Sequence, residues 1–187
     1  MKKLILLFLA GLLLSTSALA NSFTIGTGYG KEKINDNLSI DLFQVQGLYR
    51  FDNGFTRGGA VMKGFPSANT VADEERYELI VGYTTRIKKF SPYGFVSKGL
   101  RDYKQSSKAS VDYYTIKIGT TFDLSNKWYT DTNLRYRDSK DISWETNTYT
   151  FGLGYKITET ISVGIFKGWQ DGDYDSDITS ISFKKRF

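Results

Sequence analysis

The chain has 187 residues, a formal net charge of +5, 16% aromatic residues, and neither cysteine nor histidine. Without cysteine there are no disulfides or thiol nucleophiles, and without histidine there is no Ser–His or Asp–His catalytic site. Zinc sites built from these two residue types are excluded as well. We therefore expect no enzyme, no cofactor and no metal.

The first twenty residues predict a cleaved secretory signal peptide. Two lysines follow Met1, residues 4–14 form an apolar run too short to span a bilayer, and Ala18-x-Ala20 is a small-residue cleavage site. Cleavage leaves residues 21–187, a length that suits one domain. Losing the two lysines lowers the formal charge from +5 to +3, a balance that suggests no nucleic-acid partner.

The rest of the chain predicts ten β-strands, because apolar and polar residues alternate with a period of two. Between residues 146 and 156, for example, Tyr149, Phe151 and Leu153 share one face, while Thr148 and Thr150 share the other. The ten predicted segments are 22–30, 40–51, 55–65, 76–87, 91–101, 111–122, 128–137, 146–156, 160–169 and 177–187.

The connections between these segments alternate in length. Every second one is short, such as the Asn53-Gly54 turn, a strong hairpin signal. The others are longer and polar, such as residues 66–75 and 138–145. This alternation is typical of outer-membrane barrels. We predict an all-β fold: a closed antiparallel transmembrane β-barrel of about ten strands, with eight strands, twelve strands or a soluble β protein as alternatives.

Aromatic residues are predicted to form two outward rows that flank an aliphatic band, as at the two interfaces of a membrane. One row contains Phe23, Phe51, Phe55, Tyr93, Phe122, Trp128, Tyr155 and Phe187. The other contains Tyr29, Phe43, Phe65, Tyr77, Tyr114, Tyr136, Tyr149 and Trp169. In segment 91–101 this assignment turns Tyr93 and Phe95 outward and Lys98 inward.

The last segment has Ile181, Phe183 and Phe187 on one face and ends on a bare aromatic residue. It resembles the C-terminal signature of Gram-negative outer-membrane proteins, except that Lys185 occupies an outward position. The resemblance implies a monomer in the outer membrane, in contact with lipid and lipopolysaccharide. It also implies that Phe187 is a signal for the barrel-assembly machinery.

The predicted inward face is basic. By parity it carries Arg50, Arg76, Arg86, Lys98, Lys117, Arg135, Arg137, Lys184 and Arg186, against Glu78 and Asp131. Rings of arginine and lysine suit pores that pass anions. Inward glycines, such as Gly82 and Gly152, would leave space inside the barrel. Two functions fit: a narrow porin-like conduit for small anionic solutes, or a plugged barrel with a structural or surface-interaction role, braced by these side chains.

Two short segments, Arg50-Phe-Asp-Asn-Gly-Phe55 and Leu134-Arg-Tyr-Arg-Asp138, resemble parts of the small monomeric oligogalacturonate- and sialate-type porins. In that family, inward arginines imply a lumen for acidic oligosaccharides. Its members usually have twelve strands and a longer chain, and this sequence departs from both features. We therefore do not carry the family's substrate over to this chain.

Overall fold

The computed structural model describes residues 22–67, 73–104, 109–140, 142 and 144–187, so the predicted signal peptide lies outside the described residues. The strands are β1 (Ser22–Lys33), β2 (Ser39–Arg50), β3 (Phe55–Pro66), β4 (Asp73–Thr84), β5 (Phe90–Lys104), β6 (Ala109–Asp123), β7 (Trp128–Ser139), β8 (Thr146–Lys156), β9 (Ile161–Gly172) and β10 (Ser176–Arg186). Within these ranges, no helix is long and apolar enough to cross a membrane.

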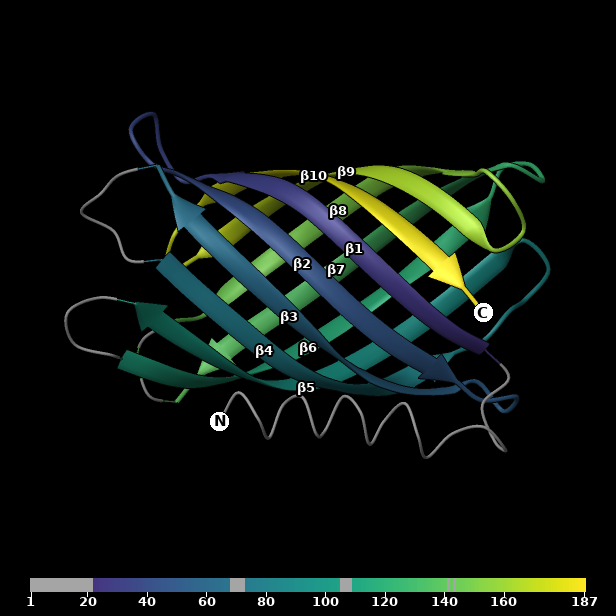
Figure 1. Ribbon diagram of the computed structural model, residues 1–187, viewed down its shortest axis with the longest axis horizontal. Coiled ribbons are helices and arrows are strands. Elements are labelled where there is room, and N and C mark those ends of the chain that lie inside the picture. Colours follow the sequence, from purple (N-terminus) through teal and green to yellow (C-terminus); the bar gives the residue numbers. More distant parts are fainter. Residues whose placement is uncertain (1–21, 68–72, 105–108, 141, 143) are drawn as a thin grey trace.

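The ten strands form one closed antiparallel barrel (Figure 1). Each strand pairs with its neighbours in the chain, and β10 pairs with β1. The strands are tilted against the barrel axis, as closure of a sheet requires. The predicted fold, with ten strands as the preferred count, is confirmed.

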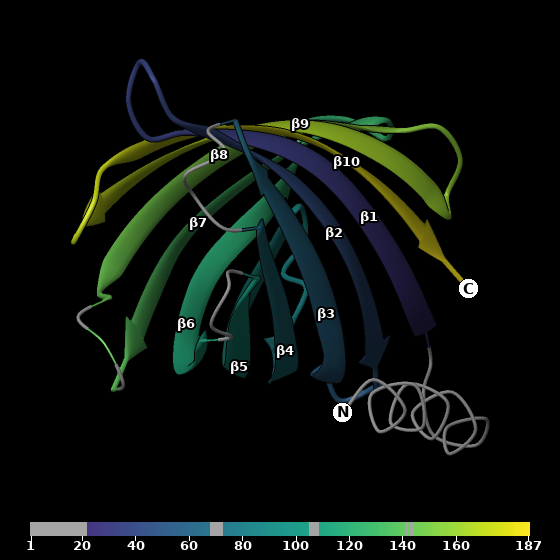
Figure 2. The same cartoon turned by 60° about the vertical axis from the view of Figure 1, so that its left-hand side comes forward.

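The two ends of the barrel differ, and we name them by their connections. At the turn end lie the short connections after β2, β4, β6 and β8, together with the start of β1 and the end of β10; at the loop end lie the other five connections (Figures 1 and 2). Several strands reach farther toward the loop end than predicted. β5 runs to Lys104 rather than residue 101, and β4 begins at Asp73 rather than residue 76.

The turn between β2 and β3 has the predicted chemistry. Gly54 adopts φ +88°, which glycine reaches without steric cost. Its N–H donates to the Phe51 carbonyl (2.9 Å), and the Asn53 side chain accepts from the Phe55 N–H (2.9 Å). The backbone groups of this turn are therefore satisfied locally.

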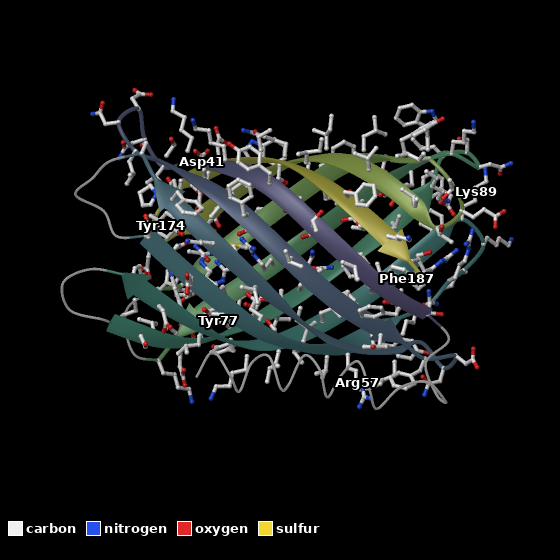
Figure 3. The ribbon with its side chains drawn as sticks, viewed as in Figure 1. Asp41, Arg57, Tyr77, Lys89, Tyr174 and Phe187 are labelled. Carbon is white, nitrogen blue, oxygen red and sulfur yellow. The ribbon has the colours of Figure 1, made fainter. Side chains whose placement is uncertain are left out.

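Phe187 closes the barrel. Its N–H donates to the Phe23 carbonyl (2.8 Å), the Phe23 N–H donates to the Phe187 carbonyl (3.2 Å), and the two rings stack 6.1 Å apart. The chain therefore ends in a backbone pair with the first strand, so the terminal aromatic side chain has a defined place on the seam at the turn end (Figure 3).

The outer surface is an exposed apolar band with aromatic residues toward both ends. Large aliphatic side chains such as Val45, Leu79 and Ile165 are about half exposed or more. Cross-strand aromatic pairs flank them: Trp128 and Tyr155 at the turn end (4.9 Å), and Tyr29 and Phe43 at the loop end (4.9 Å). Soluble monomers rarely expose so much continuous apolar surface, whereas a lipid-facing barrel requires it.

Inward aromatic rings cover several of the lumenal glycines. The ring of Phe95 covers Gly82, that of Phe166 covers Gly152, and that of Tyr113 covers Gly99; a methyl group added at any of these glycines would collide with the ring. The expectation that these glycines leave free space is therefore wrong for Gly82 and Gly152, because each makes room for a ring from the neighbouring strand.

Candidate functional site in the barrel lumen

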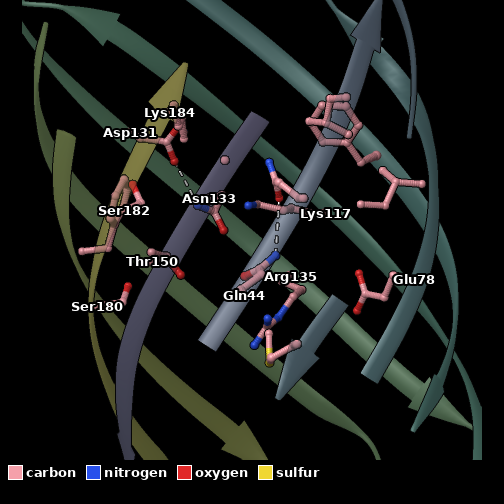
Figure 4. A pocket seen from close by; sticks show the side chains of 18 of the residues that line it. Gln44, Glu78, Lys117, Asp131, Asn133, Arg135, Thr150, Ser180, Ser182 and Lys184 are labelled. Carbon is pink, nitrogen blue, oxygen red and sulfur yellow. Dashed lines mark hydrogen bonds between the residues drawn. The ribbon is translucent and has the colours of Figure 1, made fainter. Parts of the chain in front are cut away.

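A cavity of about 560 Å³ occupies much of the lumen and is lined by residues from all ten strands (Figure 4). It reaches from Arg50 and Arg186 at the turn end to Glu32 and Gln170 toward the loop end. The sequence places these groups inside simply by alternation, since every second residue of a barrel strand faces the lumen.

Three cations, Lys117, Arg135 and Lys184, line the middle of this cavity, and we call them the lumenal trio. Lys117 and Arg135 are register partners on β6 and β7, and Figure 4 shows both side chains among those that line the cavity. The Lys117 and Lys184 ammonium groups lie 5.8 Å from the ring centres of Tyr93 and Phe166, respectively. Arg135 donates to the Thr148 hydroxyl (3.0 Å), but its Nε has no partner in the part of the chain that the structure describes.

In the described part of the chain, the nearby carboxylates form no close ion pair with the lumenal trio. Asp131 accepts from the Tyr93 hydroxyl, the Thr121 hydroxyl and the Asn133 amide, each at 3.0 Å. Glu78 accepts from the Tyr113 hydroxyl (2.8 Å). Across the described ranges, no carboxylate oxygen lies within 4.0 Å of a charged nitrogen of the trio. Asp131 is instead held by neutral donors.

The loop-end half of the lumen is packed with side chains on the side formed by β4, β5 and β7. Glu74 lies between Arg76 (2.6 Å) and Arg101, whose Nε donates to it at 2.6 Å. Beside them, a guanidinium nitrogen of Arg137 lies 4.0 Å from a carboxylate oxygen of Glu78, which is a long ion pair. These side chains come from β4, β5 and β7, and Glu74, Arg76, Arg101 and Arg137 are all buried.

Trp144, from the connection between β7 and β8, completes this packing and is 3% exposed. The guanidinium carbons of Arg101, Arg137 and Arg76 lie 4.3, 5.1 and 5.6 Å from its ring centre. Tyr113 meets it edge to face at 5.2 Å. Each cation–π contact contributes about 0.5–2 kcal/mol. We call Glu74, Arg76, Arg101, Arg137 and Trp144 the arginine–tryptophan cluster.

The predicted lumen residues therefore divide into three groups. Arg50, Lys117, Arg135, Lys184, Glu78 and Asp131 line the cavity; Arg76 lines it and also joins the arginine–tryptophan cluster, which contains Arg137 as well. Lys98 and Arg86 lie outside the lumen, so their predicted placement is wrong.

Lys98 faces outward. The predicted assignment of inward and outward residues in β5 is therefore the reverse of the observed one. The Lys98 side chain is 76% exposed and lies 3.4 Å from Asp112, while Tyr93 and Phe95 point into the lumen. Tyr93 therefore leaves the predicted outward row. The alternation in β5 misleads because aromatic residues there cover lumenal groups, such as Gly82 beneath Phe95, and do not face lipid.

Arg86 lies beyond the end of β4, in the turn toward β5. Its side chain is 63% exposed and donates to Asp123 (2.9 Å), which also accepts from Lys156 (2.6 Å). The predicted strand ran three residues too far, because polar and apolar residues keep alternating through the turn.

The sequence interpretation missed Glu32, Glu74, Arg101, Tyr113 and Trp144. Glu74 could have been found, since Glu74, Arg76 and Glu78 share one parity on β4. Arg101 was lost with the inverted parity of β5. Trp144 lies in a connection, where no periodic signal operates.

No family model matches the sequence, and no curated protein matches it. Solved structures do resemble the barrel. One is the KdgM porin in complex with disordered oligogalacturonate, with 14% identity, 88% of this chain and 99% of that chain covered, and a TM-score of 0.52.

Two further barrels of other kinds are equally similar in shape. An outer membrane channel from Pseudomonas putida F1 has 9% identity, 92% and 97% coverage and a TM-score of 0.54. The β domain of the Bordetella autotransporter BrkA has 8% identity, 88% and 98% coverage and a TM-score of 0.53. Likenesses at such low identity concern the fold. The chain therefore has the fold of small outer-membrane β-barrels, the class that its sequence pattern predicts.

Proposed function

We propose that this protein is an outer-membrane, porin-like conduit for small anionic solutes. The observation that carries the proposal is the lumenal trio, Lys117, Arg135 and Lys184, which lines a cavity without a carboxylate partner in the described structure. A charge buried in a lumen without a counter-ion is costly, so a solute that supplies carboxylate or phosphate oxygens gains affinity there.

The direction of the conduit follows from the two ends. In outer-membrane barrels the short turns face the periplasm and the longer loops face outward. With this orientation the end of the cavity lined by Arg50 and Arg186 lies on the periplasmic side. The apolar band and the aromatic rows support placement in a membrane, and the predicted signal peptide supports export.

The test is ion selectivity of the refolded barrel in a planar bilayer across a salt gradient. Changing Lys117→Gln and Arg135→Gln together should move the reversal potential toward zero or toward cation preference, because two unpaired lumenal charges are lost. The matched control is Lys98→Gln, which removes an outward lysine one strand away and should leave the reversal potential unchanged.

An anion preference that survives the double change would contradict the proposal, and so would an equal effect of Lys98→Gln. A second candidate function is a plugged barrel with a structural or surface-interaction role. The closed packing of the arginine–tryptophan cluster favours it. Correctly folded barrels that stay silent, in the wild type and in a variant opened at the loop end, would support this candidate.

A further inference from the structure

The lumen changes character sharply between its two halves. The part of the cavity toward the loop end is lined by Arg76, Glu32 and Gln170. Its lining does not include Glu74, Arg101, Arg137 or Trp144. Those four residues are all buried, Trp144 to 3% exposure. On the side of β4, β5 and β7, the loop-end half is therefore filled by side chains, and a solute in the cavity meets them there.

Trp144 differs from the rest of the arginine–tryptophan cluster in where it is attached. Arg76, Arg101 and Arg137 lie on β4, β5 and β7, strands whose ladders fix them in the wall of the barrel. Trp144 lies outside the strands, and its indole N–H has no hydrogen-bond partner among the described residues. Its position rests on ring contacts, so it is the member that can be displaced without breaking the sheet.

The indole also covers positive charge. Three guanidinium groups lie within 4.3–5.6 Å of its ring centre, and Glu74 is held by two of the three arginines. Once the ring leaves, Arg137 lies two residues from Arg135 on the same inward face of β7. The clustered arginines would then continue the lumenal trio as one line of cations toward the loop end.

We propose that Trp144 is the residue that blocks the lumen, and that an anion entering from the loop end displaces it by binding the arginines that the indole covers. This inference rests on the proposed conduit function. The competing anion is a carboxylate or a phosphate, because both match guanidinium geometry with two parallel hydrogen bonds.

The experiment compares the wild type with Trp144→Ala in a planar bilayer, with Trp169→Ala as the matched control. Trp169 is half exposed on the outer surface. Trp144→Ala should raise the single-channel conductance several-fold with the anion preference retained, and Trp169→Ala should not. Trp144→Leu, which keeps apolar bulk without a π-face, should open the lumen more often than the wild type does.

The outcomes separate the two proposals. Equal conductance of the wild type and Trp144→Ala would overturn the blocking role and leave the conduit standing. An open Trp144→Ala channel without ion preference would support the blocking role and overturn anion selectivity. Silence of both proteins, with folding verified by heat-modifiable migration on gels, would overturn both.

Fluorescence tests the blocking position without any conduction. The chain has three tryptophans, and Trp128 and Trp169 face outward. In the Trp128→Phe/Trp169→Phe variant, Trp144 is the sole indole. Its emission should resist quenching by iodide at low concentration, and added inorganic phosphate should increase that quenching. Immediate quenching in the absence of phosphate would overturn the inference, and so would protection that phosphate leaves unchanged.

Discussion

The two halves of the lumen carry similar side chains in different roles. In the loop-end half, Arg76 and Arg101 form ion pairs with Glu74, and both stack with Arg137 on Trp144. Their charges therefore interact with neighbouring side chains of the protein. In the turn-end half and the middle, Lys117 and Lys184 face a cavity, and among the described residues neither has a carboxylate oxygen within 4.0 Å. An inward arginine or lysine is therefore no evidence for a solute pathway until its partners are known.

The difference has a physical cause. Burying an unpaired charge destabilises the folded protein by several kcal/mol. When the charge is paired, the attraction between the partners roughly offsets the desolvation cost. In the arginine–tryptophan cluster, one shared carboxylate and one aromatic face stabilise the buried guanidinium groups. In the cavity, there is space for water or a solute beside the charges. A packed cluster and an open cavity thus coexist in one small barrel.

The largest expected effect comes from removing the shared carboxylate. Glu74→Gln leaves Arg76 and Arg101 buried without a charge partner, which costs about 3–5 kcal/mol of unfolding free energy. Urea unfolding in lipid vesicles measures it. Glu159→Gln, an exposed glutamate at the turn end, is the control and should change the unfolding free energy by less than about 0.5 kcal/mol. Equal values for the two variants would mean that the loop-end packing contributes little.

A smaller effect is expected from crowding the same half. Gly99→Ala places a methyl group against the ring of Tyr113, which contacts Trp144 and donates to Glu78. Overpacking of this kind costs about 1–3 kcal/mol. Gly28→Ala meets its nearest atom, the Ile181 carbonyl oxygen, at an ordinary 3.5 Å and serves as the control. The urea midpoint should fall for Gly99→Ala alone; a fall for both would assign the loss to strand glycines in general.

The smallest effect lies outside the lumen, where a charge pair at the loop end is fully exposed. Lys33 donates to Asp36 (2.8 Å), and this hydrogen bond, followed by its charge, holds the pKa of Asp36 below the ordinary value. A carboxyl group whose pKa is lower in the folded state stabilises the folded protein at pH values above its unfolded-state pKa. This contribution to stability is lost as the pH falls through the folded-state pKa.

Asp36→Asn should therefore shift the melting temperature at pH 7 by no more than the scatter of repeated measurements, because solvent screens the pair. Whatever difference exists should shrink as the pH falls below the ordinary pKa of an aspartate. A clear destabilisation at pH 7 would show that exposed and buried pairs do not differ here as proposed.

Local patterns in the sequence account for the wall of the barrel. Alternation located all ten strands, Asn53-Gly54 located a turn with φ +88° at the glycine, and the terminal Phe187 pointed to the strand that closes the barrel. These signals work because side-chain direction in a strand and turn conformation are each set within a few residues.

The same patterns gave the wrong result where contacts with distant residues decide whether a side chain faces the lumen or the lipid. In β5 the aromatic residues Tyr93 and Phe95 look lipid-facing, yet they face inward, where Tyr93 donates to Asp131 and Phe95 covers Gly82. A one-residue shift of parity reverses every side chain of a strand. That shift moved Lys98 out of the predicted lumen and concealed Arg101.

By itself, then, the sequence determined the class, the strands, the turns and a predominantly basic lumen, because each follows from periodicity and local chemistry. The tertiary structure decided which cations are neutralised. Arg101 meets Glu74 across 27 residues, and Ser176 meets Glu32 across 144. It also decided that Trp144, from a connection, is buried against Arg101 and Arg137. Such pairings arise when distant strands close into one barrel, and no local pattern encodes them.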